Sequence, residues 1–172
     1  SSAFLLQSCE ELAGDISEVK VKMPLERITF DVDSAVMAQK SDEIVFAQYT
    51  MDINSDSIMN SHGVDYLNQA AFTELVLGIV QPQDMDMSFL EAAKITVSST
   101  DSFEEEFIAA SVATIDPSKN SVELVITDFS VTEQIRQGVF YVRIYGKPNQ
   151  TLPVRTVTLF VEGKLQLVLD SL

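Results

Sequence analysis

The chain has 172 residues and a formal net charge of −15 at pH 7, and hydrophobic residues make up 46% of it. This length fits one domain or two small ones, and the hydrophobic fraction provides for a sizeable core, which excludes an intrinsically disordered chain. The negative charge repels phosphate backbones, so we expect no nucleic-acid partner. No apolar run approaches the roughly 20 residues of a membrane-spanning helix, so any membrane attachment is expected through a lipid or a partner.

The N-terminal segment contains a short apolar run, a small residue and then Cys9, the only cysteine of the chain. The string Leu6-Gln7-Ser8-Cys9 resembles the lipobox of bacterial lipoproteins. The resemblance implies cleavage after Ser8, lipidation at Cys9 and a place in the cell envelope, anchored to the outer membrane. An amphipathic helix that buries Cys9 is the alternative. One face of that helix would carry Leu5, Cys9, Leu12 and Ile16.

Three parts of the chain follow from this interpretation. We expect residues 1–8 to be a signal-peptide remnant and residues 9–18 to be a tether, because acidic and polar residues follow Cys9 at once. Residues 19–172 are expected to form a single β-sandwich domain, since no Pro/Gly/Ser-rich linker divides them.

Strand patterns dominate these residues. β-branched, aromatic and alternating apolar residues between turn signals predict strands. The predicted strands are 19–23, 28–32, 44–53, 72–80, 94–98, 107–112, 122–127, 139–145, 154–161 and 164–169. Glu162 and Gly163 lie between the last two and suggest a tight hairpin turn. The series predicts a mainly β fold, an antiparallel β-sandwich of about nine strands.

Two short crossover helices are predicted between these strands. Ser88 with Glu91, and Ser130 with Glu133, each fit the capping box that begins a helix. Gly138 is expected to end the second helix, because glycine is favoured just past a helix C-terminus. Helices so few and so short disfavour an α/β fold with a parallel sheet.

Charge is unevenly distributed along the chain. Residues 41–130 contain sixteen acidic residues and two basic ones, whereas residues 131–172 contain three acidic and five basic residues. If the fold keeps these segments apart, the molecule should have one acidic face and one near-neutral or mildly basic face. Such an asymmetry would orient a partner and speed the encounter with it.

Weak calcium candidates occur at two places. Asp52, Asn54 and Asp56 are spaced like the first oxygen ligands of a calcium loop, although the glycine and glutamate that complete such a loop are missing. Asp84 and Asp86 are the second group. The alternative is polar turns held by Asx hydrogen bonds. We therefore predict no metal site and no cofactor.

No set of catalytic residues emerges from the sequence. His62 is the only histidine and lies in a turn-like string, Met85 and Met87 fit core packing better than copper binding, and residues 104–106 are an acidic run expected in solvent. We therefore expect a protein that is not an enzyme, whose sandwich binds another envelope or outer-membrane protein or supports an assembly. A secreted ligand-binding or adhesive module, calcium-dependent or not, is the alternative.

Overall fold

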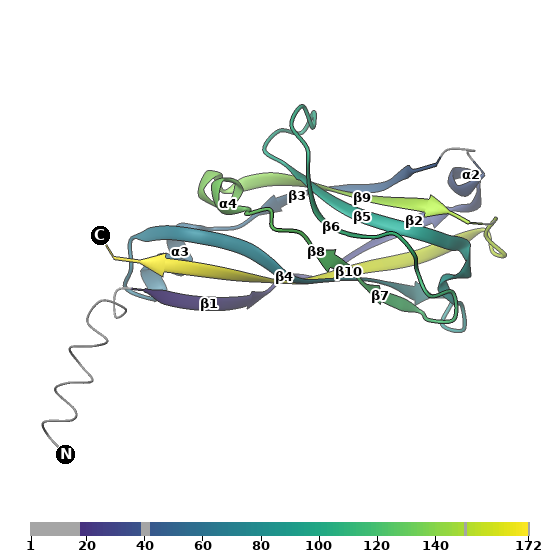
Figure 1. Cartoon of the computed structure of the whole chain (residues 1–172), viewed down its shortest axis with the longest axis horizontal. Coiled ribbons are helices and arrows are strands. Elements are labelled where there is room, and N and C mark those ends of the chain that lie inside the picture. The colour runs from purple at the N-terminus through teal and green to yellow at the C-terminus, as the bar shows by residue number, and fades with distance from the viewer. Residues whose placement is uncertain (1–17, 39–41, 150, 172) are drawn as a thin grey trace, which may run out of the picture.

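Two antiparallel sheets pack face to face in the computed structural model, which describes residues 18–38, 42–149 and 151–171 (Figure 1). The described residues form ten strands, and every strand pairing is antiparallel. The predicted β-sandwich is therefore confirmed. Residues 1–17, which include Cys9 and most of the predicted tether, lie outside the described residues.

The first sheet is built around two long strands, β4 (Tyr66–Gln81) and β10 (Thr156–Asp170). On the side of β10 away from β4, β1 (Val19–Pro24) and β2 (Ile28–Asp33) pair one after the other, so together they form one edge of the sheet. The short strand β7 (Ser121–Glu123) pairs with β4 and forms the other edge.

The second sheet has the strand order β3-β9-β5-β6-β8. Its strands are β3 (Ile44–Asp52), β9 (Val139–Pro148), β5 (Leu90–Ser98), β6 (Phe107–Val112) and β8 (Val125–Ile126). Strand β3 is one edge of this sheet and, within the described residues, pairs only with β9.

The predicted hairpin near the C-terminus is wrong, because β10 runs through Glu162 and Gly163 without a turn. Gly163 is buried, and a Cβ atom there would lie 2.8 Å from Leu75 Cδ2 and 3.2 Å from Leu25 Cδ1. Glycine in a strand often marks such a close approach. Here it makes room for neighbouring side chains, and the chain does not reverse.

The helical segments also differ from the prediction. Two α-helices missed by the sequence analysis carry the chain between the sheets, namely α2 (Ser34–Met37) and α3 (Ser55–Ser61). The first predicted helix is only the 3-10 turn η1 (Met87–Phe89), because β5 begins at once with Leu90. The second is α4 (Thr132–Gln137), which ends at Gly138 as predicted, with φ of 95°.

Neither predicted capping box forms. Glu91 lies in β5 and pairs with Lys147, at 3.0 Å, while Asp86 accepts the hydrogen bond from the Ser88 amide at the start of η1. Glu133 pairs with Arg136 one turn later in α4. Each glutamate therefore has a cationic partner in place of a backbone amide.

The fold does not keep the acidic and basic segments apart. Strand β9 lies between β3 and β5, and β10 pairs along β4, so strands from residues 131–172 lie beside strands from residues 41–130 in both sheets. Lys164 of β10, for example, pairs with Glu74 of β4 at 3.3 Å. The condition for two faces of different charge is therefore not met.

The two long sides of the sandwich are unlike each other. On one side, β7 belongs to the first sheet and β8, which follows it directly, belongs to the second, so the segment 121–126 joins the sheets. On the other side, β1 and β2 face β3, and within the described residues no strand joins them. This second side leaves the sandwich open. None of the helices in the described part of the chain is long and apolar enough to cross a membrane.

Candidate functional site

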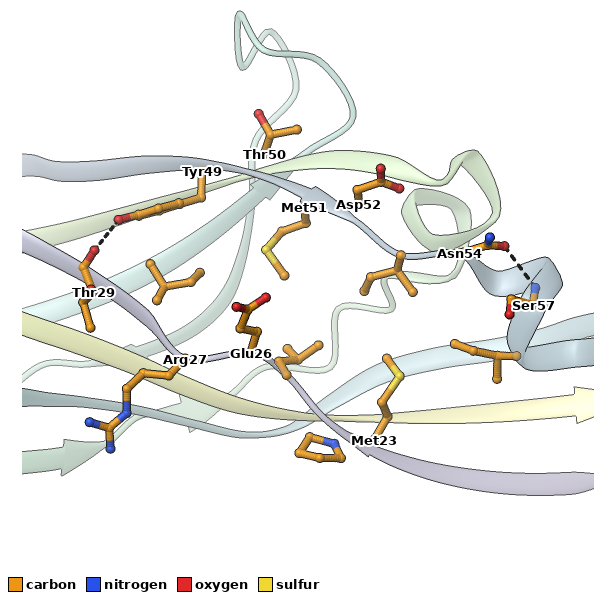
Figure 2. Close-up of a pocket in the computed structure, with 15 residues that line it drawn as sticks. Met23, Glu26, Arg27, Thr29, Tyr49, Thr50, Met51, Asp52, Asn54 and Ser57 are labelled. Atoms are coloured by element: carbon orange, nitrogen blue, oxygen red, sulfur yellow. Dashed lines mark hydrogen bonds between the residues drawn. The ribbon is translucent and has the colours of Figure 1, made fainter. Parts of the chain in front are cut away.

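A groove opens on the side where the two sheets are not joined (Figure 2). One wall is the connection between β1 and β2, from Met23 to Thr29, and the other is the end of β3 with the start of α3, from Tyr49 to Asn54 together with Ser57 and Ile58. We call this feature the edge groove. Its volume is about 780 Å³, which lies within the usual range of binding pockets.

The edge groove has an apolar floor. Met23, Leu25, Ile28, Met51 and Ile58 are partly buried and pack against the core of the sandwich. Such half-covered side chains still have apolar surface that a partner can remove from water. A narrow cavity of about 20 Å³, which shares lining residues with the groove, continues inward between the sheets. A bound chain would therefore extend the core.

Sheet edges form both walls of the groove, and in the part of the chain that the structure describes each edge has one strand partner only. Ile53, directly after β3, donates its amide to the Gly138 carbonyl, so the backbone groups of Met51 and Ile53 face β9. In an antiparallel ladder, successive residues point their backbone groups to opposite sides. Those of Thr50 and Asp52 therefore face the groove side. An exposed edge of this kind can accept an additional strand.

Tyr49 joins the two walls at one end of the groove. Its hydroxyl donates a hydrogen bond to the backbone carbonyl of Thr29, with an O–O distance of 2.6 Å (Figure 2). Burial raises the pKa of the Tyr49 phenol above 10.0, and the negative charge of Asp31 raises it further. The phenol therefore stays protonated and keeps its role as donor.

The two groups of calcium candidates lie at opposite ends of β4. Asp52, Asn54 and Asp56 surround the start of α3, whereas Asp84 and Asp86 follow the other end of the 16-residue strand β4. The Asn54 side chain accepts a hydrogen bond from the Ser57 amide, at 3.0 Å, and Asp86 does the same for Ser88, at 3.1 Å. Both are Asx caps. No group of three or more His, Cys, Asp or Glu side chains within the described ranges could hold a metal ion.

The other residues considered from the sequence are also placed. His62 is exposed at the C-terminal end of α3, where its Nδ1 lies 3.0 Å from Ser61 Oγ and 2.9 Å from the Ile58 carbonyl. Met87 is fully buried in the core, as packing predicted, and Met85 is partly buried against it. Cys9 lies outside the described residues.

Glu106 differs from the expectation of a simple solvated charge. It accepts hydrogen bonds from Thr96, at 2.6 Å, and from the Tyr145 hydroxyl, and so connects the loop before β6 to the outer surface of the second sheet. Desolvation alone would raise the pKa of this carboxyl. The two hydrogen bonds, with the charges of Arg143 and Lys94, outweigh it and lower the pKa below 4.5. The polar groups of this cluster are hydrogen-bonded to one another, so few of them are left to bind a ligand.

Sequence reasoning missed the edge groove. The signal that was available is Pro24, which ends β1 and lacks the N–H that a central strand requires, as expected at a sheet edge. Which second edge lies opposite depends on the pairing of β1 and β2 with β10, more than 120 residues away along the chain.

Comparisons with known proteins add little to this description. No family model matches the chain, and no curated protein matches it. Among solved structures, a chain of Desmodium yellow mottle tymovirus is similar over 90% of both chains, at 13% identity and a TM-score of 0.31. A chain of turnip yellow mosaic virus is similar over 90% of this chain and 95% of its own, at 13% identity and a TM-score of 0.27. Likenesses with such low TM-scores carry no argument about function.

Proposed function

We propose that this protein is a non-catalytic lipoprotein of the bacterial outer membrane that binds another envelope protein in its edge groove. The observation that carries the proposal is the pair of sheet edges, β3 on one wall and the connection between β1 and β2 on the other, with an apolar floor between them. An extended segment of a partner could add to an edge with its backbone and cover the floor with its side chains.

The contents of the groove favour binding over catalysis. Its carboxylates, Glu26 and Asp52, are both exposed, and the single histidine of the chain is not among the lining residues. General acid–base chemistry near neutral pH usually depends on histidine or on carboxylates shifted by burial. Backbone edges and apolar side chains are instead what a peptide-binding site requires.

The membrane part of the proposal rests on the lipobox resemblance at Cys9. Glu18, the first described residue, precedes β1 at the end of the sandwich that also carries α3 and the C-terminus (Figure 1). A tether ahead of β1 would hold this end nearest the membrane. The edge groove begins at α3, so it would lie within reach of proteins in the same membrane.

Site-specific photo-crosslinking in native membranes tests the proposal. A photoreactive amino acid at Thr50, whose exposed side chain lies on the outer side of β3 beside the free backbone edge (Figure 2), should crosslink to one defined envelope protein that adds a strand to this edge. The matched control is Thr114, which is exposed between β6 and β7, on the opposite side of the sandwich. Equal crosslinking from both positions, or none from Thr50, would contradict the proposal.

A further inference from the structure

The charges of the edge groove are not balanced. Glu26 and Asp52 belong to opposite walls, and among the described residues neither forms a hydrogen bond or an ion pair through its carboxylate. Figure 2 shows the Glu26 carboxylate between the two walls and the Asp52 carboxylate on the outer side of β3. The middle of an otherwise apolar floor therefore carries an anion without a partner.

The nearest cation in sequence does not compensate for this charge. Arg27 points away from the groove (Figure 2). Its Nε donates to Glu162 at 2.6 Å, and its guanidinium lies 4.1 Å from the centre of the Phe160 ring. These contacts hold Arg27 on the outer surface of the first sheet, so the negative potential of Glu26 remains available to a ligand.

A chain bound over the floor would remove Glu26 from water. An ionised carboxylate that loses its hydration is strongly disfavoured unless a cation and hydrogen bonds replace the water. Apolar residues lie on either side of Glu26. Met23 lies toward α3 (Figure 2), Ile58 belongs to α3, and Ile28 precedes Thr29, the hydrogen-bond partner of Tyr49. These residues require apolar side chains from the same ligand. The ligand therefore needs a cation between two apolar groups.

From this geometry we infer that the groove binds an extended peptide segment in which a lysine or arginine is flanked at positions two before and two after by apolar residues. Alternate residues of a strand face the same side, so this spacing places the cation over Glu26 and the apolar side chains on the floor. Asp52 adds a second negative charge near the rim. The inference rests on the proposed function and names the chemistry of its partner segment.

The backbone of the segment pairs with β3 in this arrangement. The groove side of β3 has the backbone groups of Thr50 and Asp52 free of any strand among the described residues. The strand part of this wall, Tyr49 to Asp52, is roughly 13 Å long at about 3.3 Å per residue, enough for a short strand to pair along it.

Synthetic peptides measured by fluorescence anisotropy test the inference. The probe is Val-Thr-Val-Thr-Lys-Thr-Val-Thr-Val, labelled at its N-terminus, with matched versions in which norleucine or glutamate replaces the lysine. The lysine peptide should bind about tenfold more tightly than the norleucine peptide, and the glutamate peptide more weakly than both. Methylating alternate backbone nitrogens on the side that pairs with β3 should also abolish binding, because it removes the donors of the strand.

Two variants separate a specific contact from general attraction to an acidic protein. Glu26→Gln should remove most of the preference for lysine, whereas Glu104→Gln, which removes an exposed carboxylate outside the groove, should change binding by less than about twofold. Equal effects of the two variants, unchanged binding of the methylated peptide, or no binding of any peptide at about 1 mM would overturn the inference. Crosslinking from Thr50 would still decide the proposed function separately.

Discussion

Tyr49 of β3 and Thr29 of β2 connect the two sheets across the open side of the sandwich. The Tyr49 hydroxyl donates a hydrogen bond to the Thr29 carbonyl at 2.6 Å, so a side chain of one edge strand is bonded to the backbone of the other. This contact closes one end of the edge groove and leaves its length toward α3 open. It therefore sets both the width of the groove and part of the attachment between the sheets.

Replacing Tyr49 by phenylalanine should lower the free energy of unfolding by about 0.5–1 kcal/mol, the usual worth of one partly exposed hydrogen bond. Urea unfolding at pH 7 measures this difference. Tyr141→Phe is the matched control, because the Tyr141 hydroxyl has no hydrogen-bond partner among the described residues. An equal loss in both variants would mean that the Tyr49 contact contributes nothing specific.

The same residue gives a prediction for alkaline pH. Burial, and then the charge of Asp31, raise the pKa of Tyr49 above 10.0 in the folded protein. A raised pKa means that the folded state holds the proton more tightly, so the stabilisation is complete below pH 10.0 and is lost as the pH rises through the folded pKa. Unfolding midpoints of wild type and Tyr49→Phe should therefore converge above that value, while a constant gap would contradict the assignment.

The alternation of apolar residues along β10 can already be seen in the sequence. Every second residue from Val157 to Leu169 lies on the inner face, and the pattern continues in phase through Gly163. A two-residue turn at Glu162 and Gly163 would have placed Leu165 on the face opposite to Val161. The phase therefore predicted one continuous strand, and the weight given to glycine as a turn signal produced the error.

Gly163→Ala tests the close approach that replaces the predicted turn. The added methyl group would lie 2.8 Å from Leu75 Cδ2 and 3.2 Å from both Leu25 Cδ1 and the Glu74 carbonyl, so we expect a loss of about 1–3 kcal/mol from overpacking. Lys164→Ala, at the exposed next position, should cost less than about 1 kcal/mol, because it loses only a surface ion pair with Glu74. Urea denaturation of both variants gives the comparison, and a neutral Gly163→Ala would show that the strands separate easily at this point.

The sheets were more predictable than the connections and the groove. The alternation of apolar and polar residues in a strand can be seen in a single sequence, and every predicted strand overlaps an observed one. The four-residue helix α2 and the seven-residue helix α3 are too short to develop a helical period. The groove depends on which edges face each other. Met23–Thr29 form a wall of the groove because β1 and β2 pair with β10, near the C-terminus. No local pattern in the sequence indicates that pairing.

Glu106→Gln should lower stability at neutral pH, and its difference from wild type should disappear on the acid side. Desolvation raises the pKa of Glu106. The hydrogen bonds from Thr96 and Tyr145 and the nearby cations lower it by more, so the net pKa is below 4.5. The folded state therefore favours the ionised form, and this stabilisation is present above pH 4.5 and lost as the pH falls through the folded pKa. Thermal unfolding from about pH 6 to pH 3 should fall less steeply for Glu106→Gln than for wild type. Glu104→Gln should follow the wild-type curve.

Cys9→Ala decides between the two interpretations of the N-terminal segment. If Cys9 is the lipidated residue, the variant expressed from its native gene should move from the membrane fraction to the soluble fraction, and its melting temperature should stay the same. Intact mass spectrometry of the wild-type protein should then show cleavage after Ser8 and the added acyl groups. If Cys9 is instead buried on an amphipathic helix, losing a contact worth about 1 kcal/mol should lower the melting temperature by roughly 2–4 °C and leave the location unchanged. That second outcome would refute the lipid anchor and leave binding in the edge groove to be tested by the peptide and crosslinking experiments.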